Sequence, residues 1–162
     1  MNEKGFTLVE ILVAIGIIAI LLILATLNFN EYTRKHNTEA QVKEMFTDLL
    51  AAKVDAMHRG MQYTVLFNVT ANPDTYTITD GNGNSTQKTL KYNITTSAGA
   101  GNNLTITFDT RGINTTANAP QAVCIADENS LAYDSIVINQ VKVNLAKKNS
   151  GALCASANCV IK

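Results

Sequence analysis

The chain has 162 residues, a length that suits one modest domain with one additional long element. Its 13 basic and 13 acidic residues give a formal net charge of zero, so no overall electrostatic field draws it to nucleic acid. The first 30 residues contain one continuous apolar run, whereas the sequence after about Gly60 is rich in Asn, Thr, Ser and Gly. No internal repeat and no second domain are visible.

The N-terminal segment consists of a short polar leader, residues 1–5, and a long apolar stretch. From Phe6 to Leu27 the sequence runs for 22 residues, interrupted only by Glu10 and two threonines. As a helix it would measure about 33 Å, close to the thickness of a bilayer's hydrocarbon core. A cleaved secretory signal would need a small-residue cleavage site, which Ala25-Thr-Leu27 does not supply. A buried core helix is disfavoured, because a domain this small could hardly cover a rod that is apolar all round.

Glu10 distinguishes this segment from a plain membrane anchor. An acidic side chain within an apolar span costs on the order of 2–3 kcal/mol at membrane depth, so it needs a partner. Cleavage between Gly5 and Phe6 would create a free α-amine of the required charge. We expect the amine of one subunit to pair with Glu10 of a neighbour and to set the axial register, since an unpaired carboxylate in a helix bundle is costly.

The segment Lys4-Gly5 followed by Phe6-Thr-Leu-Val-Glu10 resembles the class III signal of type IV pilins and type II secretion pseudopilins. The resemblance implies that a prepilin peptidase cleaves after Gly5, that Phe6 becomes the N-methylated first residue, and that Glu10 is the assembly glutamate. One position departs from the family pattern, because Leu27 stands where many relatives have proline. Without proline to disrupt the backbone, local melting of this helix during assembly is in doubt.

The helical pattern continues beyond the apolar stretch. Apolar positions recur at spacings of three and four residues up to Met57, and Arg59-Gly60 has the character of a helix end. The stripe comprises Val42, Met45, Phe46, Leu49, Leu50, Lys53 and Met57. The sequence therefore predicts one helix from about residue 7 to 59, whose C-terminal half packs on a sheet.

Beyond Gly60 the apolar period changes to two, which predicts strands. Seven are expected: Tyr63–Val69, Tyr76–Thr79, Leu90–Thr95, Leu104–Phe108, Ala122–Ala126, Ser135–Ile138 and Val141–Leu145. The Asp80–Asn84 run predicts a tight turn. Short strands without an intervening helix predict an α+β fold, in which the helix packs on an antiparallel domain of two sheets.

Two downstream segments extend the resemblance. Residues 55–60 resemble the junction between helix and first strand in H-type pseudopilins and FimT-like minor pilins, and Ile106–Gly112 resembles a turn of that subfamily. The resemblance implies the pilin fold, with a leader (1–5), a transmembrane and filament-core helix (6–30), and a globular domain (31–162).

The three cysteines lie in the C-terminal third, as expected of an exported domain with a structural bridge. A Cys154–Cys159 pair would close a small loop, whereas pairing Cys124 with either would link distant segments. The four-residue spacing between Cys154 and Cys159 does not match a redox dithiol or a zinc knuckle. We therefore take Cys154–Cys159 as the candidate structural bridge, leave the other pairings open and assign no role to the third cysteine.

Enzymatic chemistry has little support in the sequence. His36 and His58 lie 22 residues apart without a ligand-spaced partner, so we expect no metal site, and no motif predicts a cofactor. Asp109 and Arg111 are expected to stabilise a turn that Gly112 closes. We predict that the chain is not an enzyme.

A nucleic-acid site is a further alternative. Some FimT-like minor pilins bind DNA through a glycine–arginine–x–arginine turn, but the corresponding stretch here, Gln140–Asn144, lacks the glycine and both arginines. Lys142, Lys147 and Lys148 are the candidate DNA contacts. A few spread lysines would give weak, salt-sensitive binding.

The sequence therefore predicts a structural subunit, a minor pilin or pseudopilin of a type IV pilus or a type II secretion pseudopilus. Its expected partners are other pilin subunits, the prepilin peptidase, the assembly platform of the inner membrane and, before assembly, membrane lipid. We expect a single-pass inner-membrane protein with a periplasmic domain, later incorporated into a pilus or pseudopilus. The alternative is a minor pilin that binds DNA or a surface through its globular domain.

Overall fold

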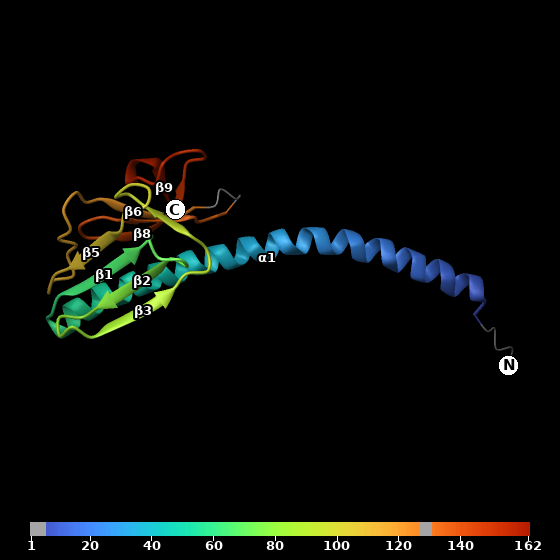
Figure 1. Cartoon of the computed structure of the whole chain (residues 1–162), viewed down its shortest axis with the longest axis horizontal. Coiled ribbons are helices and arrows are strands. Elements are labelled where there is room, and N and C mark those ends of the chain that lie inside the picture. The colour runs from blue at the N-terminus through green and yellow to red at the C-terminus, as the bar shows by residue number, and fades with distance from the viewer. Residues whose placement is uncertain (1–5, 127–130) are drawn as a thin grey trace. The chain divides into compact units, whose positions relative to one another are not determined.

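The computed structural model describes residues 6–126 and 131–162, with the side chains of residues 23–28 also outside the description. Over these residues the chain forms one α-helix, one short 3₁₀ helix and nine strands (Figure 1). The helix α1 spans Leu8–Arg59 and the 3₁₀ helix spans Ser156–Asn158. The strands are β1 (Tyr63–Asn68), β2 (Thr75–Thr79), β3 (Ser85–Thr89), β4 (Ile94–Thr96), β5 (Leu104–Phe108), β6 (Gln121–Ile125), β7 (Ser135–Ile138), β8 (Val143–Lys148) and β9 (Cys159–Ile161).

The chain divides into two compact units, with α1 contributing to both. The first unit ends at His36 and the second comprises Asn37–Lys162. The helix runs through position 27 without a break, as expected for a helix without proline there. The predicted helix, from about residue 7 to 59, is confirmed.

In the second unit, α1 presents a buried face to the core. Its residues recur every three or four positions, and they are Val42, Met45, Leu49, Ala52 and Ala56. This spacing places them on one side of a helix, so the predicted stripe is confirmed at Val42, Met45 and Leu49. Phe46 and Leu50 are partly buried against the same core. Met57 differs, because its side chain is 45% exposed. Gly60 follows the helix with a φ of +63°, the left-handed conformation in which helices commonly end.

The first sheet has the strand order β3-β2-β1-β5, and all its neighbours are antiparallel. Alternate residues of β1 are buried in the core, namely Tyr63, Val65 and Phe67, as the period of two requires. Figure 1 shows β1, β2 and β3 lying over the C-terminal part of α1. One face of this sheet therefore contributes to the core and the other faces away from it.

The second sheet has the order β4-β6-β7-β8-β9, again antiparallel. Every residue of β6 and β7 is buried, so these central strands are covered on both faces. Val123 and Ile136 belong to the core shared with α1 and the first sheet. The molecule thus has an α+β architecture, a helix packed on two antiparallel sheets, which is consistent with the pilin fold.

The strand predicted at Leu90–Thr95 is misplaced, because only its last two residues lie in a strand, β4 (Ile94–Thr96), and the preceding strand is β3 (Ser85–Thr89). The turn at Asp80–Asn84 forms as expected, with the Asp80 N–H donating to the Asn84 carbonyl, and it pairs Thr79 directly with Ser85. β3 is therefore the polar segment Ser85–Thr89, an edge strand without the apolar alternation that reveals a strand. The short β9 was not predicted either. The hairpin between β7 and β8 turns at Asn139–Lys142, so β8 begins at Val143 and not at Val141.

The predicted Cys154–Cys159 bridge is also wrong. Cys124 forms a disulfide with Cys154, and Cys159 is a free thiol. Cys124 lies on the central strand β6, where no contiguous pattern indicates that the segment before the 3₁₀ helix will pack beside it. The bridge links positions 30 residues apart and fixes the C-terminal segment to the second sheet.

Candidate functional site

The predicted assembly glutamate lies in the first turn of α1, where it forms a reciprocal cap with Thr7. The backbone N–H and the hydroxyl of Thr7 donate to Glu10 Oε2 at 2.9 Å and 3.0 Å, and the Glu10 N–H donates to Thr7 Oγ1 at 3.3 Å. This is the capping box, in which two side chains satisfy amide groups left free at a helix N-terminus. The spacing Thr-x-x-Glu predicts it, but the sequence interpretation gave Glu10 only its role between subunits.

The residues around this cap are apolar and exposed. Phe6 is 84% exposed, and every residue from 6 to 22 is exposed. Their side chains are aliphatic or aromatic apart from a few small or polar ones and Glu10. Exposed aliphatic surface of this extent marks a segment whose normal surroundings are lipid or other protein.

Two predictions for this segment reach beyond the described residues. Gly5, the residue expected to precede the cleavage site, lies outside them, and so do the side chains at 23–28 of the predicted membrane segment. Within the described parts of the chain, no helix is long and apolar enough to cross a membrane.

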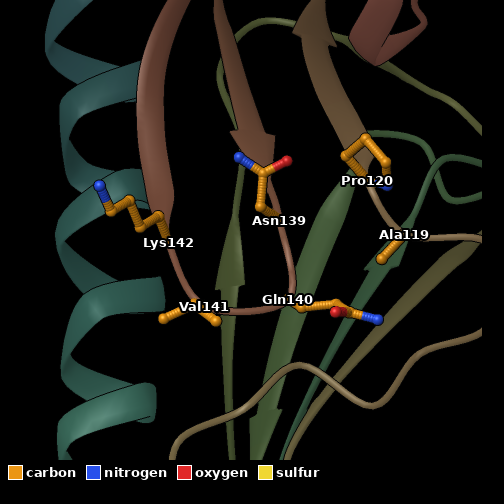
Figure 2. Close-up of a pocket in the computed structure, with 6 residues that line it drawn as sticks. All are labelled: Ala119, Pro120, Asn139, Gln140, Val141 and Lys142. Atoms are coloured by element: carbon orange, nitrogen blue, oxygen red, sulfur yellow. The ribbon is translucent and has the colours of Figure 1, made fainter.

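The three candidate DNA-contacting lysines do not form one cluster. Lys142 is exposed in the β7–β8 turn, and Figure 2 shows its side chain extending towards α1. The Lys147 ammonium donates to the Leu131 carbonyl at 2.7 Å, and its side chain is half-buried. Lys147 and Lys148 are consecutive in β8, so their side chains lie on opposite faces of the sheet.

A pocket of about 430 Å³ lies beside this turn (Figure 2). Its lining comprises Ala119, Pro120, Asn139, Gln140, Val141 and Lys142. The turn is held to the helix, because the Lys53 ammonium donates to the Val141 carbonyl. The polar groups of the lining are two side-chain amides and one lysine, without a nucleophile or an acid–base pair. We therefore interpret the pocket as a surface depression and not as a catalytic site.

The turn that contains Asp109 and Arg111 forms as predicted. Asp109 Oδ1 accepts the N–H groups of Arg111 and Ile113, at 2.9 Å and 2.8 Å, and Oδ2 accepts the Arg111 guanidinium. Gly112 closes the turn with a φ of +71°. These two charged side chains therefore support one another and the backbone.

A polar network at the sheet edge, which the sequence did not reveal, joins α1 to β3. The Lys88 ammonium lies 2.9 Å from Glu44 Oε1 and 2.7 Å from Asp48 Oδ2, and the Tyr76 hydroxyl donates to the same Asp48 oxygen. Burial, and then the bond to Asp48, raises the pKa of the Tyr76 hydroxyl, which stays protonated. The network holds the polar edge strand against the helix, and its partners are too distant in sequence for a spacing rule.

Comparison with known proteins identifies the N-terminal segment. Residues 1–26 match the family model of the prokaryotic N-terminal methylation motif. No curated protein and no solved structure matches the chain. The matched segment contains Gly5, Phe6 and Glu10 and extends through the exposed apolar helix. The match supports a type IV pilin-like precursor, which is processed by a prepilin peptidase and assembles with other pilins.

Proposed function

We propose that the chain is a structural subunit, a minor pilin or H-type pseudopilin, of a type IV pilus or a type II secretion pseudopilus. One observation carries the proposal: the methylation motif leads directly into a helix whose residues 6–22 are all exposed and largely aliphatic. Such a helix needs lipid before assembly and other helices afterwards. The exchange of one apolar environment for another has a small net cost.

The assembly mechanism has three steps. The prepilin peptidase removes residues 1–5 and methylates the amine of Phe6. The chain is then held in the inner membrane by its apolar helix, with the globular domain on the periplasmic side. During extraction, Glu10 exchanges its bonds with Thr7 for the amine of a neighbouring subunit, which fixes the axial register.

Glu10→Gln tests the pairing step more specifically than substitution of Glu10 by alanine, which would also remove the helix cap. The glutamine keeps an acceptor oxygen for Thr7, so the helix cap survives, but it lacks the charge that attracts an amine. We expect Glu10→Gln to insert and be cleaved normally, and to be lost from sheared filaments. Glu31→Gln, on the same helix, is the matched control and should incorporate like the wild type. Normal incorporation of Glu10→Gln would contradict the charge pairing.

The cleavage step has its own test. Replacing Gly5 with leucine should prevent peptidase cleavage, so the purified chain should retain the mass of residues 1–5. Intact-mass spectrometry of membrane extracts measures this directly. Loss of the leader from that variant would mean that Gly5 does not define the cleavage site.

The alternative, a minor pilin that binds DNA through its globular domain, has weaker support. The Lys147 ammonium donates a hydrogen bond to the Leu131 carbonyl, and the Lys148 side chain lies on the other face of β8. A gel-shift assay of the detergent-solubilised chain at low and high salt distinguishes the two functions. The absence of a shift at low salt would exclude DNA binding, whereas a salt-sensitive shift that Lys142→Ala abolishes would support it.

A further inference from the structure

The face of the first sheet that points away from α1 carries a regular array of uncharged side chains, all of them polar except Leu66. The strand registers align them in three rows across the strands: Ser85–Thr79–Thr64–Thr107, Gln87–Thr77–Leu66–Thr105, and Thr89–Thr75–Asn68. We call these eleven residues the threonine face. Seven are threonine, and none is charged.

The two faces of these strands are chemically distinct. Core residues such as Val65, Tyr76 and Ile106 alternate with members of the threonine face along β1, β2 and β5. Lys88, the charged residue of β3, lies opposite Tyr76 and reaches α1 instead. Threonine is favoured in strands, and the one charged residue of β1, β2, β3 and β5 lies on the other side, so the threonine face itself carries no charge.

The hydroxyl groups of this face are spaced and constrained by the sheet. Neighbouring strands lie about 4.8 Å apart, and alternate residues within a strand about 6.8 Å apart, so the hydroxyls occupy a two-dimensional grid. Threonine is β-branched, which restricts its side-chain rotation and lowers the entropy lost on binding. Ser85, Gln87, Thr89 and Thr105 are exposed, and Leu66 is 36% exposed near the centre. The other members are partly exposed, except Thr75, which is buried and does not present its hydroxyl.

The charge and shape of the face select one class of partner. Each hydroxyl can donate one hydrogen bond and accept two, which complements a surface that itself presents repeated hydroxyl groups. Without Lys or Arg, the threonine face cannot neutralise phosphates, so nucleic acid does not fit it. It also lacks the aromatic and basic side chains that mark a membrane-binding surface.

We propose that the threonine face binds a neutral polysaccharide that presents a flat array of hydroxyls. The face has no aromatic ring on which a single sugar could stack, so binding relies on many hydrogen bonds to an extended polymer. Each bond contributes modestly, and charge screening has little effect on them. This inference goes beyond the filament role and does not depend on it.

Adsorption of the full-length chain in detergent micelles to microcrystalline cellulose tests the proposal. We expect binding that is unchanged between low and high salt. Thr64→Val/Thr77→Val removes two hydroxyls while keeping the β-branched shape, and should lower the bound fraction about tenfold at limiting cellulose. Thr110→Val, in the β5–β6 turn, is the matched control and should bind like the wild type.

Two further measurements keep the test decisive. Gln87→Ala, on the exposed edge strand, should also weaken binding. It replaces the double variant in the test if circular dichroism shows that the double variant is unfolded. Phosphocellulose provides the charged comparison. Wild-type chain that does not bind cellulose, that binds only phosphocellulose at low salt, or that binds as well with the substitutions as without them would overturn the proposal.

Discussion

Glu10 serves two purposes at one position. Within the subunit its carboxylate satisfies the backbone N–H and hydroxyl of Thr7, and in the proposed filament it accepts the charge of a neighbouring amine. The local cap therefore gives the carboxylate a partner before the subunit meets another. A side chain that would otherwise be an unpaired charge in an apolar helix is satisfied in both states.

The turn at Asp109 should make the free energy of unfolding depend on pH in the acidic range. The N–H of Ile113 and then the Arg111 guanidinium hold the pKa of Asp109 below its ordinary value. Since the folded pKa lies below the unfolded one, about 3.9, the stabilisation is present above that value and is lost as pH falls through the folded pKa. The urea concentration at the unfolding midpoint should decrease as the pH is lowered below about 4. In Asp109→Asn this decrease should be smaller. An unchanged pH profile in the variant would contradict this role.

Gly112 is constrained by both its conformation and its neighbours. Its φ is +71°, and an added Cβ would lie 2.7 Å from Met57 Cγ. We expect Gly112→Ala to lower the free energy of unfolding by about 1–3 kcal/mol, measured by urea denaturation. Gly83→Ala is the control, because Gly83 has a φ of +87° but no atom lies within 4 Å of its Cβ position. Its loss of stability should therefore come from the backbone conformation alone. Adding Met57→Ala should recover the difference between the two variants.

At the scale of elements, the disulfide is the tie between the second sheet and the C-terminal segment. It closes a span of 30 residues, so Cys124→Ser should lower the free energy of unfolding by roughly 2–4 kcal/mol. Cys159→Ser should have little effect on urea stability, since Cys159 is unpaired. Thiol titration of the denatured, unreduced wild type should detect the Cys159 thiol alone. Stability loss in Cys159→Ser equal to that in Cys124→Ser would contradict the pairing.

The edge strand β3 shows why a polar strand is difficult to predict from sequence. Its side chains alternate between Lys88, which bonds to α1, and residues of the threonine face, so neither side of it is apolar. Hydrophobic periodicity therefore indicated the next apolar segment instead. The turn at Asp80–Asn84 was recognised, because its signal is local.

At the scale of the whole molecule, the two units should differ in solubility. The full-length chain, with its exposed apolar residues 6–22, should enter the detergent-rich phase in a Triton X-114 partition. A fragment beginning at Asn37 retains the core and the disulfide, and should remain in the aqueous phase. Partition of the fragment with the detergent would show that its surface, and not the first unit, carries the affinity.

The sequence by itself determined the features whose evidence is contiguous. The peptidase signal around Gly5 and Phe6, the helix to Arg59 and the tight turn at Asp80–Asn84 each depend on residues within a few positions of one another. The α+β class followed from the change in apolar period after Gly60.

Only the tertiary structure decided the features that join distant segments. Three interactions depend on which strands become neighbours. They are the disulfide of Cys154, the ion pair between Lys88 and α1, and the hydrogen bond from Lys147 to the Leu131 carbonyl. The threonine face belongs to this group, because its rows exist only once four strands are in register. Strand order and register are set by burial across the whole core, which no short window of sequence contains.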